Sequence, residues 1–232
     1  MAQSKGFDIS ALSYDDFIHY FFTAPDNELW KIDDDGEEFW FPVKANPAVL
    51  VRHLTRFCTE FRQIADRVSP QTLDHGIDGM LSAANFQLQT VLWDNKIPIE
   101  ERIGCIRSMC RVFADFVANR KVETLEGSYF MWWDHLATSF WFEQTYHRKL
   151  PSENYELLPE DDRRIVDAMF ETLMEILRLD DDRVKSCALH GLGHLHHPQV
   201  RSVVQQFIEN QSTGLTADAI SWLEKCRDGK VM

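Results

Sequence analysis

The histidines of CALHGLGHLHHPQV, residues 187–200, are the side chains of this sequence whose spacing best suits chemistry. Four imidazoles fall within eight positions, and imidazole is both a frequent metal ligand and a base that titrates near neutral pH. If the segment is helical, His190 and His194 lie one turn apart on one stripe, as two ligands of one ion should. His197 would extend that stripe if the helix reached it, although Pro198 disfavours this.

Two interpretations of these histidines stay open. The first is a metal-dependent or other hydrolytic enzyme that uses His190, His194 and His197. The second is a structural helix end, where exposed imidazolium groups lie beside the buried face and interact favourably with the helix dipole. Gly191 follows His190, so the glutamate of a His-Glu-x-x-His zinc motif is absent. We therefore favour the structural interpretation and predict no cofactor and no catalytic residue.

Other polar groups fall inside an aromatic segment, residues 127–147, which is apolar around nearly its whole circumference. Asp134, His135 and Glu143 lie within it, and buried titratable groups can mark an acid–base site. Because no partner nucleophile is identifiable, we interpret them as hydrogen-bonded core groups. The aromatic side chains of the segment suit a central helix, or alternatively a binding surface.

A second cluster of carboxylates and aromatic rings occupies an acidic aromatic loop, predicted at residues 24–46. A calcium loop of the EF-hand type would place Lys31 at its first position and Pro42 at its twelfth, and neither supplies a carboxylate. We expect a solvated loop whose rings anchor it to the helical body, and we take it as the candidate surface for a protein partner. The candidate binding residues are Trp30, Asp33, Asp34, Asp35, Glu37, Glu38 and Trp40.

Helical periodicity dominates the sequence, and prolines fall close to several of the predicted helix starts. The predicted fold class is all-α, with about nine helices in antiparallel pairs. Their expected ranges are 13–23, 47–67, 70–93, 98–119, 127–147, 160–179, 182–195, 198–210 and 216–227. The last three carry apolar residues at i, i+3, i+4 and i+7 and are joined by short turns, so they must stack in layers.

The stretch DDRVKSCALHGLGHLHHPQVRSVVQQFIEN resembles a HEAT-type repeat, and the clear match covers about residues 181–210. The family's first helix is matched at Val184, Ala188, Gly191, Leu192, Gly193 and Leu195. This resemblance implies an α–α superhelix, and we extend it as one α-helical repeat domain over residues 1–232, because repeats need stacked neighbours to bury their faces. The Gly-Leu-Gly turn lacks the third glycine of a dinucleotide-binding fingerprint and follows a helical pattern.

Composition narrows the class of partner. The 232 residues carry 24 basic and 37 acidic side chains, a net charge of −13, which disfavours nucleic acid and anionic membrane surfaces and favours a basic protein. No apolar run has the length of a signal peptide or a membrane span, and five cysteines without a CxxC pair suit reduced thiols, so we expect a cytoplasmic protein.

These observations lead to one functional hypothesis and its alternatives. We expect a non-enzymatic, protein-binding helical-repeat protein. Its charge and class resemble those of immunity-type inhibitors of basic toxins, or of an adaptor. The enzyme that uses the histidines of 190–197 is the first alternative, and self-association through an aromatic surface is the second.

Overall fold

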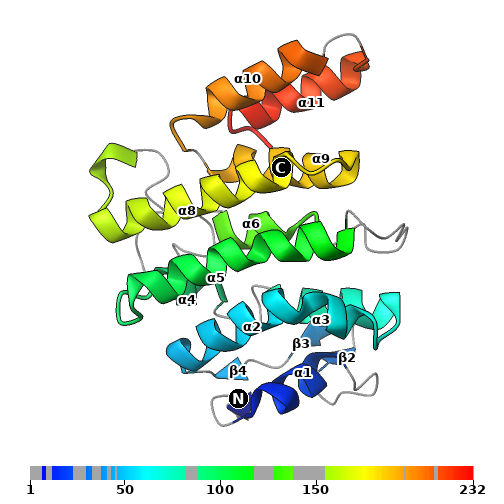
Figure 1. Cartoon of the computed structure of the whole chain (residues 1–232), viewed down its shortest axis with the longest axis vertical. Helices are drawn as coiled ribbons and strands as arrows, with labels where there is room; N and C mark the ends of the chain where they lie inside the picture. Colours follow the sequence, from blue (N-terminus) through cyan, green and yellow to red (C-terminus); the bar gives the residue numbers. More distant parts are fainter. Residues whose placement is uncertain are drawn as a thin grey trace.

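The computed structural model shows an all-α protein, as the helical periodicity predicts (Figure 1). It describes residues 7–8, 12–22, 30–32, 38–40, 43–44, 46–81, 88–117, 128–137, 155–195, 197–211 and 214–231. The α-helices within these ranges are α1 (Tyr14–Phe22), α2 (Pro47–Ala65), α3 (Pro70–Leu81), α4 (Leu88–Trp93), α5 (Ile99–Arg111), α6 (Trp132–Ala137), α8 (Glu160–Leu177), α9 (Asp182–Leu195), α10 (Val200–Gln211) and α11 (Ala217–Arg227).

Local sequence explains where several helices begin. Asn46 accepts a hydrogen bond from the Ala48 N–H at 3.0 Å, and Pro47 occupies the first turn of α2, where a missing N–H costs nothing. Asp181 accepts from the N–H groups of Arg183 and Val184 at the start of α9. Side-chain oxygens thus satisfy amide groups that have no partner within the helix.

The helices stack in layers along the long axis of the molecule (Figure 1). α2 packs on α5, α5 on α8, and α8 on α9, while α10 and α11 form the last layer, with α11 against α9. Only residues 178–181 separate α8 from α9, so the chain reverses direction between them. The C-terminal residues fold back onto α9, where a β-carbon at Gly193 would lie 2.7 Å from Val231.

One buried core runs through these layers. Its largest fully buried side chains include Trp132 and Trp133 of α6 and Phe57 and Phe61 of α2. Phe113 lies in a π-helical turn, η1 (Val112–Val117), and packs edge-on against Trp132. In the described part of the aromatic segment predicted to be central, Tyr129, Trp132, Trp133 and Leu136 are buried, whereas Met131 is exposed.

Three predicted helices differ from those observed. Within the range 70–93 the described residues form α3 and α4, and residues 82–87 lie outside the described ranges. The range 98–119 ends as an α-helix at Arg111, where η1 follows. Of the predicted helix 127–147, α6 covers residues 132–137, and residues 138–154 lie outside the described ranges. Apolar periodicity continues across the change at Val112, so it overestimates the length of that α-helix.

The segment 24–46 is not a loop throughout. β2 (Trp30–Ile32) pairs antiparallel with β3 (Glu38–Trp40), opposing Trp30 to Trp40, and β4 (Val43–Lys44) pairs in parallel with β1 (Phe7–Asp8). Alternation of charged and aromatic residues around Gly36 is compatible with such a hairpin. Across the described ranges, we find no helix whose length and apolarity would let it cross a membrane.

Candidate functional site

Asp134, His190 and His194 come together between α6 and α9. His190 Nδ1 and His194 Nε2 each lie 3.2 Å from Asp134 Oδ1, and the two Nε2 atoms lie 3.3 Å apart. The side chain of His190 is 2% exposed, and those of Asp134 and His194 are 12% and 13% exposed. We call these three residues the His–Asp cluster.

Helix α9 positions both imidazoles through its own geometry. His190 and His194 are one turn apart and point to the same side, as their spacing predicts. The prediction that they are exposed at a helix end is wrong for His190, which is buried. Gly191 on α9 lets α6 come close, and Phe130, which precedes α6, stacks on the His190 ring.

The close approach of α6 requires glycine at residue 191. A β-carbon there would lie 2.7 Å from Cβ and Cγ of Trp133, which immediately precedes Asp134. The ring of Phe130 stacks on that of His190, with centroids 4.3 Å apart and planes 17° from parallel. Packing around His190 thus fixes both its ring plane and its distance from the carboxylate.

The carboxylate itself is incompletely satisfied. Asp134 Oδ1 is buried and receives no hydrogen bond from the described residues, although two ring nitrogens lie 3.2 Å away. A buried carboxylate oxygen without a donor is costly. Within the described ranges, these three residues form a group of metal-ligand type, with ligand atoms all within 4.8 Å of one another.

His197 belongs to a different site. α9 ends at Leu195, so His197 leaves the stripe and its Nε2 lies 3.3 Å from Asp167 Oδ1 on α8. Its ring stacks on Phe170 at 4.1 Å, and the Tyr155 hydroxyl donates a hydrogen bond to the same Asp167 oxygen. The prediction that groups His197 with His190 and His194 is therefore wrong, because the turn before Pro198 redirects the chain.

The environment of His197 favours its neutral form. Its Nδ1 accepts a hydrogen bond from the Gln199 N–H at 3.2 Å, which leaves the Nε2–H to face Asp167. Burial lowers the pKa of His197 below its usual value, and the nearby Asp167 carboxylate only partly opposes this. His197 closes the turn between α9 and α10 and joins it to α8.

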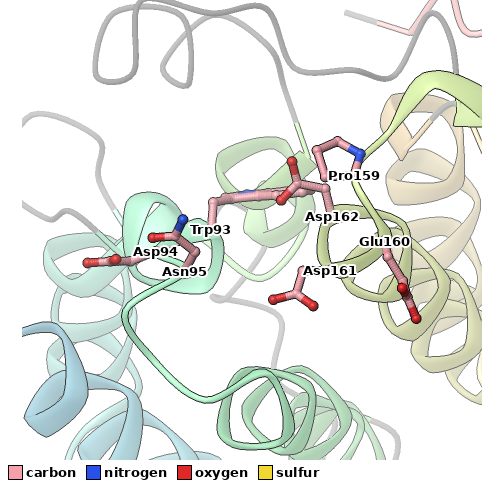
Figure 2. A pocket seen from close by; sticks show the side chains of 7 residues that line it. All are labelled: Trp93, Asp94, Asn95, Pro159, Glu160, Asp161 and Asp162. Atoms are coloured by element: carbon pink, nitrogen blue, oxygen red, sulfur yellow. The ribbon is translucent and has the colours of Figure 1, made fainter.

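A pocket lined with carboxylates opens between the end of α4 and the start of α8 (Figure 2). Its volume is ≈ 560 Å³, and in Figure 2 the Trp93 ring reaches toward Asp162 and Asp161, whereas the Asp94 carboxylate is directed away from them. The residues around this acidic pocket are Trp93, Asp94, Asn95, Pro159, Glu160, Asp161 and Asp162. Sequence reasoning missed it, because Asp94 lies far along the chain from the other three carboxylates.

The buried guanidinium of Arg102 binds one carboxylate of the acidic pocket. It donates to Asp161 Oδ2 at 2.9 Å, and to the carbonyl oxygens of Ile97 at 3.1 Å and Leu92 at 3.4 Å. Arg102 therefore ties the α4–α5 connection to α8 and offsets one of the four carboxylate charges.

Four of the seven predicted binding residues lie outside the part of the chain that the structure describes. These are Asp33, Asp34, Asp35 and Glu37. The backbones of Trp30, Glu38 and Trp40 belong to the β2–β3 pair. These residues remain predicted binding residues.

The sequence singles out all three members of the His–Asp cluster but supplies no reason to connect them. Asp134 interrupts an apolar helix, and the two imidazoles border the small-residue face of another helix. A polar residue in an apolar helix is the signal that could have paired them.

Comparisons with known proteins add no assignment: no family model matches the sequence, and no curated protein or solved structure matches it significantly. The HEAT-type resemblance over residues 181–210 accordingly stays a prediction.

Proposed function

We propose that this protein is a non-enzymatic helical scaffold that binds a basic protein partner, acting as an inhibitor of the immunity type or as an adaptor. The observation that carries the proposal is the acidic pocket of ≈ 560 Å³, which is lined by three carboxylates from the first turn of α8 and by Asp94, the residue after α4. A lysine or arginine side chain of a partner is the complementary group.

The charge of the pocket has two sources. Glu160, Asp161 and Asp162 occupy the first turn of α8, where negative charge already suits the helix dipole. Asp94 directly follows α4, so its negative charge is not explained by a helix N-terminus, although its side chain accepts a hydrogen bond from the Lys96 N–H. Asp94 therefore distinguishes the pocket from an ordinary acidic helix start.

The net charge of the whole chain also favours a basic partner. A net charge of −13 attracts a basic surface over the Debye length, about 8–10 Å at ordinary ionic strength. Stacked helices offer a broad, rigid surface of the kind that helical-repeat proteins use for binding. All five cysteines are free thiols, which suits action in a reducing compartment such as the cytoplasm.

The test compares two doubly neutralised variants. Asp94→Asn/Glu160→Gln removes two charges from the pocket and keeps the oxygen that accepts from Lys96. Glu209→Gln/Asp218→Asn removes two charges from exposed positions on α10 and α11. Each protein is used to capture partners from the producing cell, and a captured partner is then purified and titrated at low and high salt.

We expect wild type and the α10–α11 variant to retain a basic partner that the pocket variant loses, with affinity falling as salt rises. An immunity-type inhibitor would also suppress the activity of that partner. Recovery of acidic or neutral partners only, or a complex that is indifferent to salt, would contradict the proposal.

A further inference from the structure

We infer that the His–Asp cluster binds a divalent transition metal of the zinc class. The ligand set is two imidazoles and one carboxylate, a combination that zinc and non-haem iron share. His190 and His194 come from one helix at i and i+4, and Asp134 comes from a helix packed across them. This site is separate from the acidic pocket and does not depend on the binding of a protein partner.

The separations between ligand atoms suit a common ion. The two Nε2 atoms lie 3.3 Å apart, and His194 Nε2 lies 3.2 Å from Asp134 Oδ1. Ligands at about 2.0–2.2 Å in a tetrahedral zinc site are themselves roughly 3.3–3.5 Å apart. His190 is nearest His194 through Nε2 and nearest Asp134 through Nδ1, and one ligand atom from each of the three residues lies within 4.8 Å of the others. A rotation of the His190 ring and of the carboxylate would direct all three toward one position.

The charge balance of the cluster also points to a cation. Asp134 Oδ1 is buried without a hydrogen bond from the described residues, and two further polar ring atoms are packed beside it. When the two Nε2 atoms form a hydrogen bond, one of them carries the shared proton and the other accepts it. A dication would satisfy the carboxylate oxygen and the ring lone pairs together.

The surroundings hold the ligands in place before any ion binds. Phe130 stacks on His190, and Gly191 permits the contact with Trp133 that brings Asp134 to the rings. Such outer contacts orient ligands and raise affinity. His190 is closed to solvent while His194 and Asp134 keep some exposure, so an ion would enter from their side.

The number of ligands suggests what the metal would do. Within the described ranges, the ligand group has three members, the number that catalytic zinc sites use when they keep a position for water. Metal-bound water is the nucleophile of metal-dependent hydrolysis, the alternative activity that the histidine spacing raised.

Metal binding is measured on the full chain after removal of bound ions with a chelator. Zn²⁺ is titrated calorimetrically, and Co²⁺ is titrated with its visible absorption as the reporter of coordination. We expect one ion per chain, an increase in thermal midpoint with Zn²⁺, and an X-ray absorption spectrum of the zinc form that contains two imidazole ligands.

Three variants assign the site. Asp134→Asn and the partly exposed His194→Gln should each weaken binding by more than the roughly 10- to 100-fold that loss of an outer-shell partner costs. His53→Gln is the matched control, because His53 is partly buried and packs against Leu12 and Tyr14, outside the cluster. Circular dichroism verifies that each variant is folded.

Two results would overturn the inference. One is a folded wild-type protein that takes up neither ion stoichiometrically or whose bound zinc has no imidazole ligands. The other is equal affinity of wild type, His194→Gln and Asp134→Asn, which indicates adventitious binding at other histidines. The X-ray absorption measurement uses wild type alone, so the inference is testable even if a variant fails to fold.

Discussion

Gly191 of α9 lies directly against Trp133 of α6: a β-carbon at residue 191 would come within 2.7 Å of Cβ and Cγ of Trp133 and 2.8 Å of Leu173. Cβ of Trp133 is tied to the backbone and cannot move aside as the end of a flexible side chain could. This contact sets the distance between the helix that carries His190 and the helix that carries Asp134.

The Gly191→Ala variant should therefore lose stability. Alanine favours a helix over glycine by about 1 kcal/mol, but overpacking against Trp133 costs about 1–3 kcal/mol, so the net change is destabilising. Gly104→Ala on α5 is the control, because no atom lies within 4 Å of its β-carbon position and only the helix preference remains. In urea unfolding, the free energy of unfolding should decrease for Gly191→Ala and increase for Gly104→Ala. An equal increase for both variants would contradict the close contact at residue 191.

Replacing the buried Arg102 should reduce the free energy of unfolding much more than replacing the exposed Arg107 of the same helix. Arg102→Met removes donors to the carbonyl oxygens of Ile97 and Leu92, and an unsatisfied buried acceptor costs about 1–3 kcal/mol. Arg107→Met makes the same change on α5, where Arg107 pairs with Glu171 at the surface and the pair is worth about 0–1 kcal/mol. We expect the free energy of unfolding to fall by about 2–4 kcal/mol for Arg102→Met and by less than about 1 kcal/mol for Arg107→Met.

Stability should decrease with acid through His197. Burial lowers the pKa of His197 in the folded chain, so the unfolded chain takes up the proton first as the pH falls below about 6.5. The contribution of His197 to the free energy of unfolding is complete above that pH and declines as the pH falls toward the folded-state pKa. Below the folded-state pKa it no longer changes with pH. Urea unfolding of wild type and His197→Gln between pH 5 and pH 8 should give a difference that shrinks toward acid. A difference that does not change with pH would contradict the assignment.

Thiol reactivity should be low in the native state. Burial raises the pKa of Cys105, Cys187 and Cys226 to about 12, and that of the half-buried Cys110 to about 11. Since the thiolate is the reactive form, a chromogenic disulfide reagent at pH 8 should modify Cys110 first and the others on unfolding. Cys110→Ser should abolish the early phase. Rapid modification of several thiols in the folded wild-type protein would contradict the burial of Cys105, Cys187 and Cys226.

Local sequence was sufficient for most helix boundaries. α8, α9, α10 and α11 lie within two residues of their predicted ends, because apolar spacing and caps act over one or two turns. The predicted end of the helix 98–119 was wrong. The predicted helix 98–119 changes to a π-helical turn at Val112, and apolar spacing does not register such a change.

The candidate sites also depend partly on local spacing and partly on tertiary contacts. The spacing of His190 and His194 by itself determined that they share one face of a helix, because four residues make one turn. Only the tertiary structure decided that Asp134 joins them, that His197 faces Asp167 instead, and that Asp94 lines the same pocket as the start of α8. Those contacts join segments separated by tens of residues, and they depend on how closely helices pack. Glycine at 191 makes the first of them sterically possible, but the identity of the residue that packs there is not encoded within any local stretch of the chain.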